Sequence, residues 1–472
     1  MRTIAKFLAS AIVLFSLTQC ADDETVLKPV EQTPLPEETS SLSIANVGTI
    51  ISCDDCTYVV PDSTKIVDGT KLGIKAGDVI CLSGSNSYAS IIFRNIVGEP
   101  GNPVIIRSCG GVATIDGTGS GYTMKTERSR YIRITGGTEK PHGLRIVGGR
   151  MGLMLETLTS DVEVDRVEIA NIGFAGIMAK TEPTCKDETL RGNFVMRNIS
   201  LHHNYVHDTG GEGFYVGHSR YNEGITLSCG VRMPHEIHGV KIYNNVVVNA
   251  GWEAIQVGST TKGAMVFNNR IENYGVANQN FQNNGIQFGE GAPGTCFANF
   301  INGGKGAGII ILGNAENFVH DNVILNAGSM GIFIDERAAR GDGFRIVNNT
   351  IVNPGTDAIR LYSEYVPNVV MNNIIVNPGN FDFYTYPRSS ADSYLYLLSK
   401  TVPVTKANNI FTTNISDLHF LNPDANNFRL TRESPAVDAG ADISTYRIAT
   451  DNAKQNRLRG ATYDIGAYEL QY

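Results

Sequence analysis

The sequence predicts an all-β protein, a single-stranded parallel β-helix in which each coil gives one short strand to each of three sheets. A strand pattern, Gly or Ala followed by an apolar, a variable and an aliphatic residue, recurs seven times between residues 175 and 362. Asparagines between strand pairs recur every 23 to 30 residues. Glycine is frequent, with 50 residues, and only 18% of residues are charged, which is typical of turn-rich β proteins.

Residues 1–20 are predicted to be a lipoprotein signal peptide. Two basic residues precede an apolar run, 7–17, that is too short to anchor the chain stably across a bilayer. The following "LTQC" resembles a bacterial lipobox, which implies a lipid on Cys20. Gln19 departs from the small residue usual at its position, and an ordinary secretory signal is the alternative.

The segment after Cys20 is predicted to be a disordered tether, residues 21–45. It contains three prolines, several acidic residues and few large apolar ones. Its first residues, "ADDE", resemble the surface-export signal of Bacteroidota lipoproteins. That resemblance implies that the lipid holds the protein on the outer face of the outer membrane.

Residues 46–472 are predicted to form the β-helix and a C-terminal capping segment. A period near 23 residues, with no helical span between the short strands, indicates a solenoid. Asparagine tolerates the left-handed backbone conformation that a sharp corner requires. We therefore expect one corner of successive coils to stack the asparagines at positions 245, 269, 299, 322, 349 and 373.

Two segments resemble known proteins. "KAGDVICL…IVGEPGNPVIIRSCGG" resembles the opening of many right-handed, pectate-lyase-like β-helix proteins, among them polysaccharide lyases that act on alginate and dermatan sulfate. "FRLTRESPAVDAGAD…YDIGAYEL" resembles the closing segment of bacterial surface and secreted β-helix proteins. The resemblance, over about residues 70–470, implies a right-handed coil. The activity stays open, because lyases, hydrolases, epimerases and non-catalytic adhesins share this architecture.

Seven cysteines follow Cys20, and disulfides are favoured in an exported chain. Cys185 and Cys229 lie in insertions after successive repeat strands, and we expect them to pair. Cys81 and Cys109 end two strands about one coil apart, and we assign them to a disulfide as well. Cys53 and Cys56 lie in one loop and could pair with each other or bind a metal. Cys296 has no obvious partner.

Aligning the repeats gives two polar columns on neighbouring coils. Glu212 and Glu253 precede the Gly or Ala position, and Asn284 follows on the next coil. A second column should face outward and form the floor of a groove: Tyr215, Gln256 and Gln287. Because neighbouring strands lie ~4.8 Å apart, the two glutamates should interact, and one should have a raised pKa.

The glutamate pair has three possible roles. It could supply the acid and base of glycoside hydrolysis. It could bind Ca²⁺, with Asn284 as a third oxygen ligand, and no other cofactor is expected. It could also be structural, with both carboxylates capping turn amides.

Two long insertions, 181–193 and 220–239, should wall the groove on one side. Lys180 and His218 would lie at its rim, where His218 could carry a proton and Lys180 could act as a base. Arg220 and Tyr221 would help to bind the substrate. We find neither the catalytic motif of the lyases nor the aspartate signature of polygalacturonases.

The leading functional hypothesis is a surface lipoprotein that binds or cleaves a polysaccharide, as a lyase or as a glycoside hydrolase. The alternative is a non-catalytic surface module, or a component of an outer-membrane protein assembly. An open groove around an acid/base pair would favour the first, and glutamates bonded to backbone amides would favour the second. A net charge of −8, without a Lys/Arg block, argues against nucleic acid as a partner.

Overall fold

The computed structural model describes residues 51–137, 142–313, 316–337, 341–379 and 394–471. The predicted signal peptide, the lipid on Cys20 and the tether fall outside these described residues. Within the described ranges, no helix is long and apolar enough to cross a membrane.

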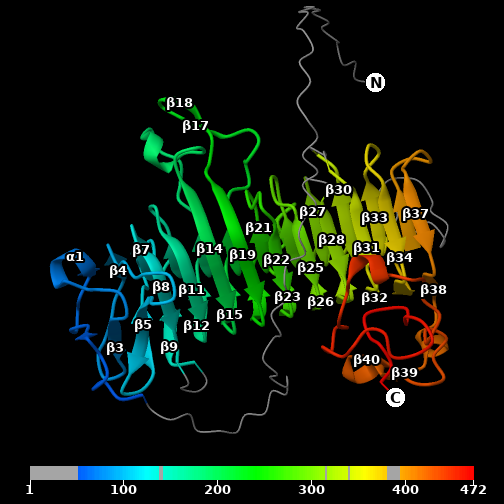
Figure 1. Ribbon diagram of the computed structural model, residues 1–472, viewed down its shortest axis with the longest axis horizontal. Helices are drawn as coiled ribbons and strands as arrows, with labels where there is room; N and C mark the ends of the chain where they lie inside the picture. Colours follow the sequence, from blue (N-terminus) through cyan, green and yellow to red (C-terminus); the bar gives the residue numbers. More distant parts are fainter. Residues whose placement is uncertain (1–50, 138–141, 314–315, 338–340, 380–393, 472) are drawn as a thin grey trace, which may run out of the picture. The chain divides into compact units, whose positions relative to one another are not determined.

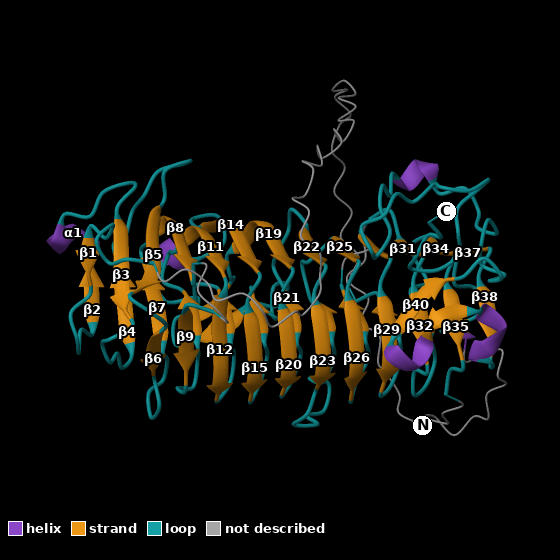
Figure 2. Cartoon of the chain, turned by 90° about the horizontal axis from the view of Figure 1, so that it is seen from below, coloured by secondary structure: helices purple, strands orange, loops and turns teal. Residues whose placement is uncertain are grey.

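Three parallel sheets of 13, 12 and 11 strands wind together, and each coil adds one strand to each sheet (Figure 1, Figure 2). The predicted three-sheet parallel β-helix is therefore confirmed. Sheet A contains β1 (Tyr58–Val59), β3 (Val79–Ser83), β5 (Val104–Cys109), β8 (Arg130–Thr135), β11 (Ser160–Asp165), β14 (Val195–His202), β19 (Glu236–Tyr243), β22 (Ala264–Phe267), β25 (Gly294–Phe297), β28 (Asn317–His320), β31 (Phe344–Val347), β34 (Asn368–Met371) and β37 (Val404–Ala407).

Sheet B contains β2 (Ile66–Asp68), β4 (Ile91–Arg94), β7 (Met124–Glu127), β10 (Leu153–Leu155), β13 (Ile177–Ala179), β16 (Phe214–Val216), β21 (Ile255–Val257), β24 (Ile286–Phe288), β27 (Ile309–Leu312), β30 (Ile332–Asp335), β33 (Ile359–Tyr362) and β36 (Leu395–Leu397). Sheet C contains β6 (Ala113–Asp116), β9 (Leu144–Val147), β12 (Val167–Ile172), β15 (Tyr205–Thr209), β20 (Val246–Ala250), β23 (Arg270–Tyr274), β26 (Phe300–Gly304), β29 (Val323–Ala327), β32 (Thr350–Val352), β35 (Ile374–Val376) and β38 (Ile410–Thr412).

The remaining elements lie outside the coils. A one-turn helix, α1 (Gly69–Leu72), begins at Asp68, whose carboxylate accepts a hydrogen bond from the Thr70 amide at 3.1 Å. Two antiparallel pairs are formed by β17 (Ile225–Leu227) with β18 (Gly230–Arg232) and by β39 (Phe420–Asn422) with β40 (Asn427–Leu430). Short 3-10 turns span Asp187–Thr189, Ile415–Leu418, Pro423–Ala425 and Ser444–Tyr446.

The core lies inside the coils, because alternate residues of each strand point inward. Ile255, Ile286 and Ile309 occupy the same inward position on β21, β24 and β27, and all three are fully buried. Burying one such side chain contributes ~1.5–3 kcal/mol. The same inward column continues through most coils, which makes one continuous apolar core.

The predicted asparagine corner is confirmed between sheets A and C. Asn245 donates from its backbone amide and from Nδ2 to Asn269 Oδ1, at 3.1 and 3.0 Å. The pattern repeats along the coils through Asn204, Asn245, Asn269, Asn299, Asn322, Asn349, Asn373 and Asn409. The left-handed residue is the one before each stacked asparagine, such as Asn244 with φ 54°. In each "NN" pair, the first residue therefore makes the turn and the second makes the bonds.

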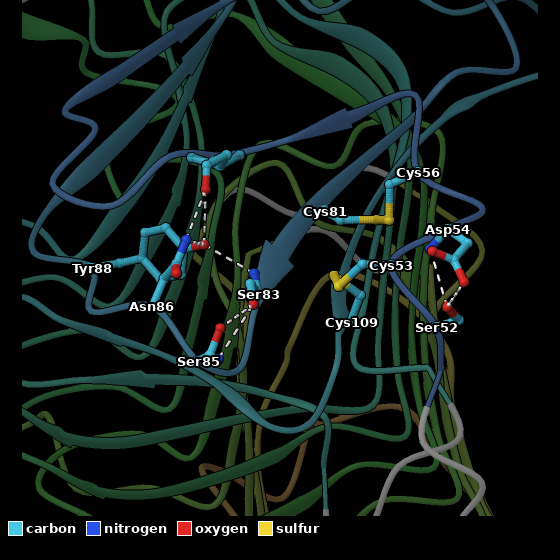
Figure 3. Close-up of a disulfide and its surroundings, with 11 residues drawn as sticks. Ser52, Cys53, Asp54, Cys56, Cys81, Ser83, Ser85, Asn86, Tyr88 and Cys109 are labelled. Carbon is cyan, nitrogen blue, oxygen red and sulfur yellow. Dashed lines mark hydrogen bonds between the residues drawn. A yellow bond between two sulfur atoms is a disulfide. The ribbon is translucent and has the colours of Figure 1, made fainter.

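Three disulfides are present among the described residues. Cys185 is joined to Cys229, as the sequence predicts, with Cα atoms 5.9 Å apart. The assignment of Cys81 to Cys109 is wrong, because Cys109 pairs with Cys53 and Cys81 pairs with Cys56 (Figure 3). In the register of β3 and β5, Cys109 lies beside Ser83 and Cys81 lies beside Arg107, so these two side chains are not opposite each other. The segment before β1 therefore holds both strands. The buried thiol among the described residues is Cys296.

The C-terminal segment packs against the outer face of sheet C. Phe420, Phe428 and Leu430 form a second apolar cluster with Val323 and Ile374 of the sheet. The fully buried Arg457 forms an ion pair with Asp321, and Nη1 lies 3.5 Å from Glu469. Hydrogen bonds from Asn452 to Asp321 and from Asn348 to Asp464 thus join the C-terminal segment to coils that lie more than 100 residues earlier in the sequence.

Candidate functional site

The outer face of sheet B carries the predicted polar column, but Gln256 and Gln287 are only 2% and 5% exposed, so the expectation that they form an open groove floor is wrong. The register places Tyr215, Gln256 and Gln287 side by side on β16, β21 and β24. Gln287 Nε2 donates to Gln256 Oε1 at 3.0 Å, and Gln256 Nε2 donates to Ser219 Oγ at 2.9 Å. Tyr215 Oη lies 3.1 Å from the same Ser219 Oγ. The column is thus a continuous hydrogen-bonded row that ends at Ser219, an exposed residue that the sequence analysis did not identify.

Glu212 and Glu253 lie next to this row, at the turns that lead from sheet C into sheet B. Their residues are only 2% and 0% exposed, so they do not line an open groove. Each has one oxygen, Oε2, without a hydrogen-bond partner in the described part of the chain. Glu253 Oε1 accepts a bond from Asn284 Nδ2 at 3.0 Å. The column of two acids and one amide therefore forms as predicted, but beneath the surface.

Burial controls the ionisation of this pair. It raises the pKa of Glu212 to about 7, against the smaller effects of its own backbone amide and of the positive Lys180. Burial, and then the negative charge of Glu212, raise the pKa of Glu253 to about 8. Near neutral pH, the pair can hold a proton and a negative charge at the same time.

The arrangement of Asn284 does not fit the calcium site considered from the sequence. Asn284 Oδ1 accepts a hydrogen bond from the Ala307 amide at 3.1 Å, which fixes the orientation of the side-chain amide. Its Nδ2 donor then faces Glu253. Ca²⁺ takes oxygen ligands, and Asn284 presents a nitrogen donor to the pair instead. These residues, as arranged, suit a shared proton better than Ca²⁺.

Lys180 lies beside Tyr215 and is nearly buried. Its ammonium is 2.6 Å from Glu182 Oε1 and 4.1 Å from the centre of the Tyr215 ring. Burial alone would lower the pKa of Lys180, but Tyr215 and Glu182 outweigh burial and raise it. A lysine held in its charged form is a poor general base. Glu182, which the sequence analysis did not identify, is the ion-pair partner of Lys180.

His218 is a buried neutral side chain. Its Nε2 donates to the Thr181 carbonyl at 3.1 Å, while the Thr181 amide donates to His235 Nε2 at 2.9 Å. Burial lowers the pKa of His218 to about 2 and that of His235 to about 4. The two histidines hold the Thr181 peptide from both sides. This contact fixes the positions of Lys180 and Glu182 on either side of Thr181.

The two long insertions are tied together beside sheet B, where β17 and β18 project from the coils in Figure 1. Tyr221 packs under Arg191, 3.7 Å from the ring centre, and its Oη donates to Glu236 Oε1 at 3.0 Å. Arg220 is exposed on the same loop. Tyr221 therefore serves to hold the loop, and the structure does not bring it to the glutamate pair.

Aromatic residues that the sequence analysis missed lie at the same turns. Phe174 and Trp252 are half-buried and meet edge to face, with ring centres 5.0 Å apart. Phe174 also lies 6.5 Å from the Tyr215 ring. We call Phe174, Trp252 and Tyr215 the aromatic platform. One feature of the sequence could have indicated this platform: Trp252, the only tryptophan of the chain, directly precedes Glu253.

A glycine allows the platform to form. Phe174 and Trp252 belong to turns two coils apart, and Gly211 occupies the equivalent position between them. A Cβ atom on Gly211 would lie 2.6 Å from a ring carbon of Phe174, closer than atoms can approach. The missing side chain therefore leaves the space in which the two rings meet.

A family model supports the fold, and solved structures of low sequence identity are similar to the chain. The family described as "Right handed beta helix region" matches residues 229–394, and the chain is a right-handed parallel β-helix. Pectate lyase Pel9A is 13% identical over 89% of this chain and 98% of that one, with a TM-score of 0.48. A GH136 lacto-N-biosidase from Eubacterium ramulus is 13% identical over 76% and 67%, with a TM-score of 0.48. An alginate lyase from Paenibacillus sp. str. FPU-7 is 17% identical over 76% and 99%, with a TM-score of 0.37. No curated protein matches the sequence.

Proposed function

We propose that the outer face of sheet B binds a polysaccharide and that the Glu212–Glu253 pair cleaves it by glycoside hydrolysis. One observation carries this proposal: two interacting carboxyl groups on adjacent coils have pKa values near neutrality, next to a half-buried aromatic platform. Hydrolysis of a glycosidic bond needs one carboxylic acid and one carboxylate. A pair that shares one proton near neutral pH supplies both forms.

The spacing of the coils is compatible with this chemistry. Adjacent strands of a parallel sheet lie ~4.8 Å apart. Two carboxyl groups ~5–5.5 Å apart are typical of glycosidases that act through a covalent intermediate and retain the anomeric configuration. A lyase mechanism has less support, because Lys180 is held protonated by Glu182 and His218 is held neutral by burial.

A second candidate is a module that binds a glycan without cleaving it, alone or within an outer-membrane protein assembly. The burial of both carboxyl groups favours this candidate, as do the bonds that their own backbone amides make to them. In this case the pair would stabilise the turns, and the platform would supply the binding surface.

A glycan panel separates the two candidates. The purified protein is incubated with polysaccharides of different composition, and both new reducing ends and unsaturated products are measured. Hydrolysis predicts new reducing ends without unsaturated products, and Glu212→Gln or Glu253→Gln should lower this activity at least ~100-fold. Glu99→Gln, at an exposed glutamate between β4 and β5, is the control for the general effect of removing a carboxylate. Unsaturated products would contradict hydrolysis, and unchanged activity in both Gln variants would exclude the pair from catalysis.

We also propose that a lipid on Cys20 holds the protein at the outer membrane, with residues 21–45 as the spacer. The apolar run 7–17, the "LTQC" sequence and the acidic residues after it support this location. Cys20→Ala should move the protein from the membrane fraction to the soluble fraction. In cells with the unchanged chain, protease added outside should degrade the protein. Protection of the unchanged chain from protease would contradict surface display.

A further inference from the structure

The aromatic platform is positioned as a ligand surface. The core of the β-helix lies inside the coils, whereas Phe174, Trp252 and Tyr215 lie outside it and keep part of their rings accessible. Contacts connect the platform to the glutamate pair: Phe174 touches Tyr215, Lys180 lies over the Tyr215 ring, and Lys180 interacts electrostatically with Glu212. A partly exposed aromatic group beside buried polar groups is typical of a binding site.

The loop between β23 and β24, on the next coil, extends this surface. Gly275 and Ala277 donate backbone hydrogen bonds to the carbonyls of Trp252 and Gly251, at 3.1 and 3.0 Å. The same loop carries Phe281, whose residue is 89% exposed. Residues 275–285 contain no Asp, Glu, Lys or Arg, and six of the eleven are Asn or Gln. Amide side chains can both donate to and accept from hydroxyl groups.

The charges around the platform favour an uncharged ligand. The Lys180 ammonium is neutralised by Glu182 at 2.6 Å. The exposed Arg150 lies over the Phe174 ring, with its guanidinium carbon 5.7 Å from the ring centre. The two buried groups next to the platform are carboxyls, which become negative as the pH rises. A sugar that carries its own carboxylate would be repelled by them and would find no unpaired buried cation among the described platform residues.

We propose that the aromatic platform is a subsite for an uncharged pyranose ring, which stacks its apolar face on Trp252, above the buried Glu212–Glu253 pair. This inference rests on the proposed function and deepens it, because it assigns the substrate to neutral glycans rather than to polyuronates. Selection arises from the charge of the carboxyl pair, and affinity arises from the aromatic rings.

The single tryptophan makes a direct test possible. Because Trp252 is the only tryptophan, the tryptophan fluorescence of the full chain reports on this position alone. The protein is titrated with neutral oligosaccharides of glucose, galactose, mannose and xylose. Oligomannuronate is tested beside β-linked manno-oligosaccharides, which differ in the carboxylate at carbon six. We expect a saturable fluorescence change with at least one neutral oligosaccharide and none with oligomannuronate. No saturable change with any neutral sugar, or tighter binding of the uronate, would overturn the proposal.

Variants test which side chains are responsible. Calorimetry with the neutral oligosaccharide that binds should show about tenfold weaker affinity for Trp252→Ala, which corresponds to a loss of ~1.4 kcal/mol. Gly211→Ala should have a similar effect, because its Cβ displaces Phe174. Phe411→Ala is the matched control, since Phe411 is a partly exposed aromatic residue on β38, stacked on Tyr394 far along the chain. Unchanged affinity in folded Trp252→Ala would contradict the subsite.

The result also separates the subsite from the proposed hydrolysis. Fluorescence that responds to a neutral sugar without new reducing ends would support the subsite and contradict cleavage. New reducing ends that form equally fast with Trp252→Ala, at substrate concentrations below saturation, would support cleavage and contradict the subsite. Thermal unfolding of each variant shows whether it retains the fold.

Discussion

At the scale of single residues, Glu253 shows how burial links ionisation to stability. Its pKa is about 8 in the folded protein, against 4.5 for an ordinary glutamate, so the folded state binds this proton more tightly than the unfolded state. Stability from this proton is therefore fully present below about pH 4.5 and is lost as the pH rises toward 8. Each pKa unit of difference between the folded and unfolded states corresponds to ~1.4 kcal/mol in the free energy of unfolding. Glu212, with a pKa of about 7, acts in the same direction.

This linkage predicts a stabilising substitution. Glu253→Gln keeps the shape and an acceptor for Asn284 Nδ2 but cannot ionise. Thermal unfolding measured from pH 5 to pH 9 should show a falling midpoint for the unchanged protein and a weaker fall for Glu253→Gln, because Glu212 still titrates. At pH 9 the variant should be the more stable of the two. A variant midpoint that falls as steeply as that of the unchanged protein would contradict the raised pKa.

At the scale of structural elements, the asparagine ladder couples each coil to the next. Asn299 accepts from the backbone and side chain of Asn269 and donates to Asn322 Oδ1 at 2.9 Å. A second, exposed ladder lies at the far end of sheet C, where Asn326 donates to Asn302 at 3.0 Å. The two ladders make similar bonds, but only the first lies where water cannot replace a lost partner.

We therefore expect unequal effects from equal substitutions. Asn299→Ala should lower the free energy of unfolding by ~1–3 kcal/mol for each buried group that it leaves without a partner. Asn302→Ala removes an exposed bond and should change stability by less than ~0.5 kcal/mol. Urea unfolding of both variants measures the difference. Equal losses would show that burial does not determine the strength of the ladder.

At the scale of the whole molecule, the repeats predicted the fold, but apart from the Cys185–Cys229 disulfide the contacts outside the coils were not predicted. Strand positions and the asparagine corner followed from periodicity, because each coil repeats one local pattern. The disulfide partners of Cys53 and Cys56 depend on where the segment before β1 crosses the first coils, and no repeat encodes that path. The Phe174–Trp252 contact depends on Gly211 between them. The burial of the glutamates depends on how the turns pack, so the sequence predicted their column and wrongly predicted an open groove.

The first coil determines how this end of the β-helix meets other molecules. Strands β1 and β2 are only two and three residues long, and two disulfides hold the preceding segment against β3 and β5. A longer free strand at the end of a sheet is a template onto which another chain can add its own strand, and repeated addition yields fibres. The short, covalently fastened first coil offers few such backbone groups. We therefore expect the two disulfides to help to keep this end monomeric, and reduction of Cys53–Cys109 and Cys56–Cys81 to promote polymerisation.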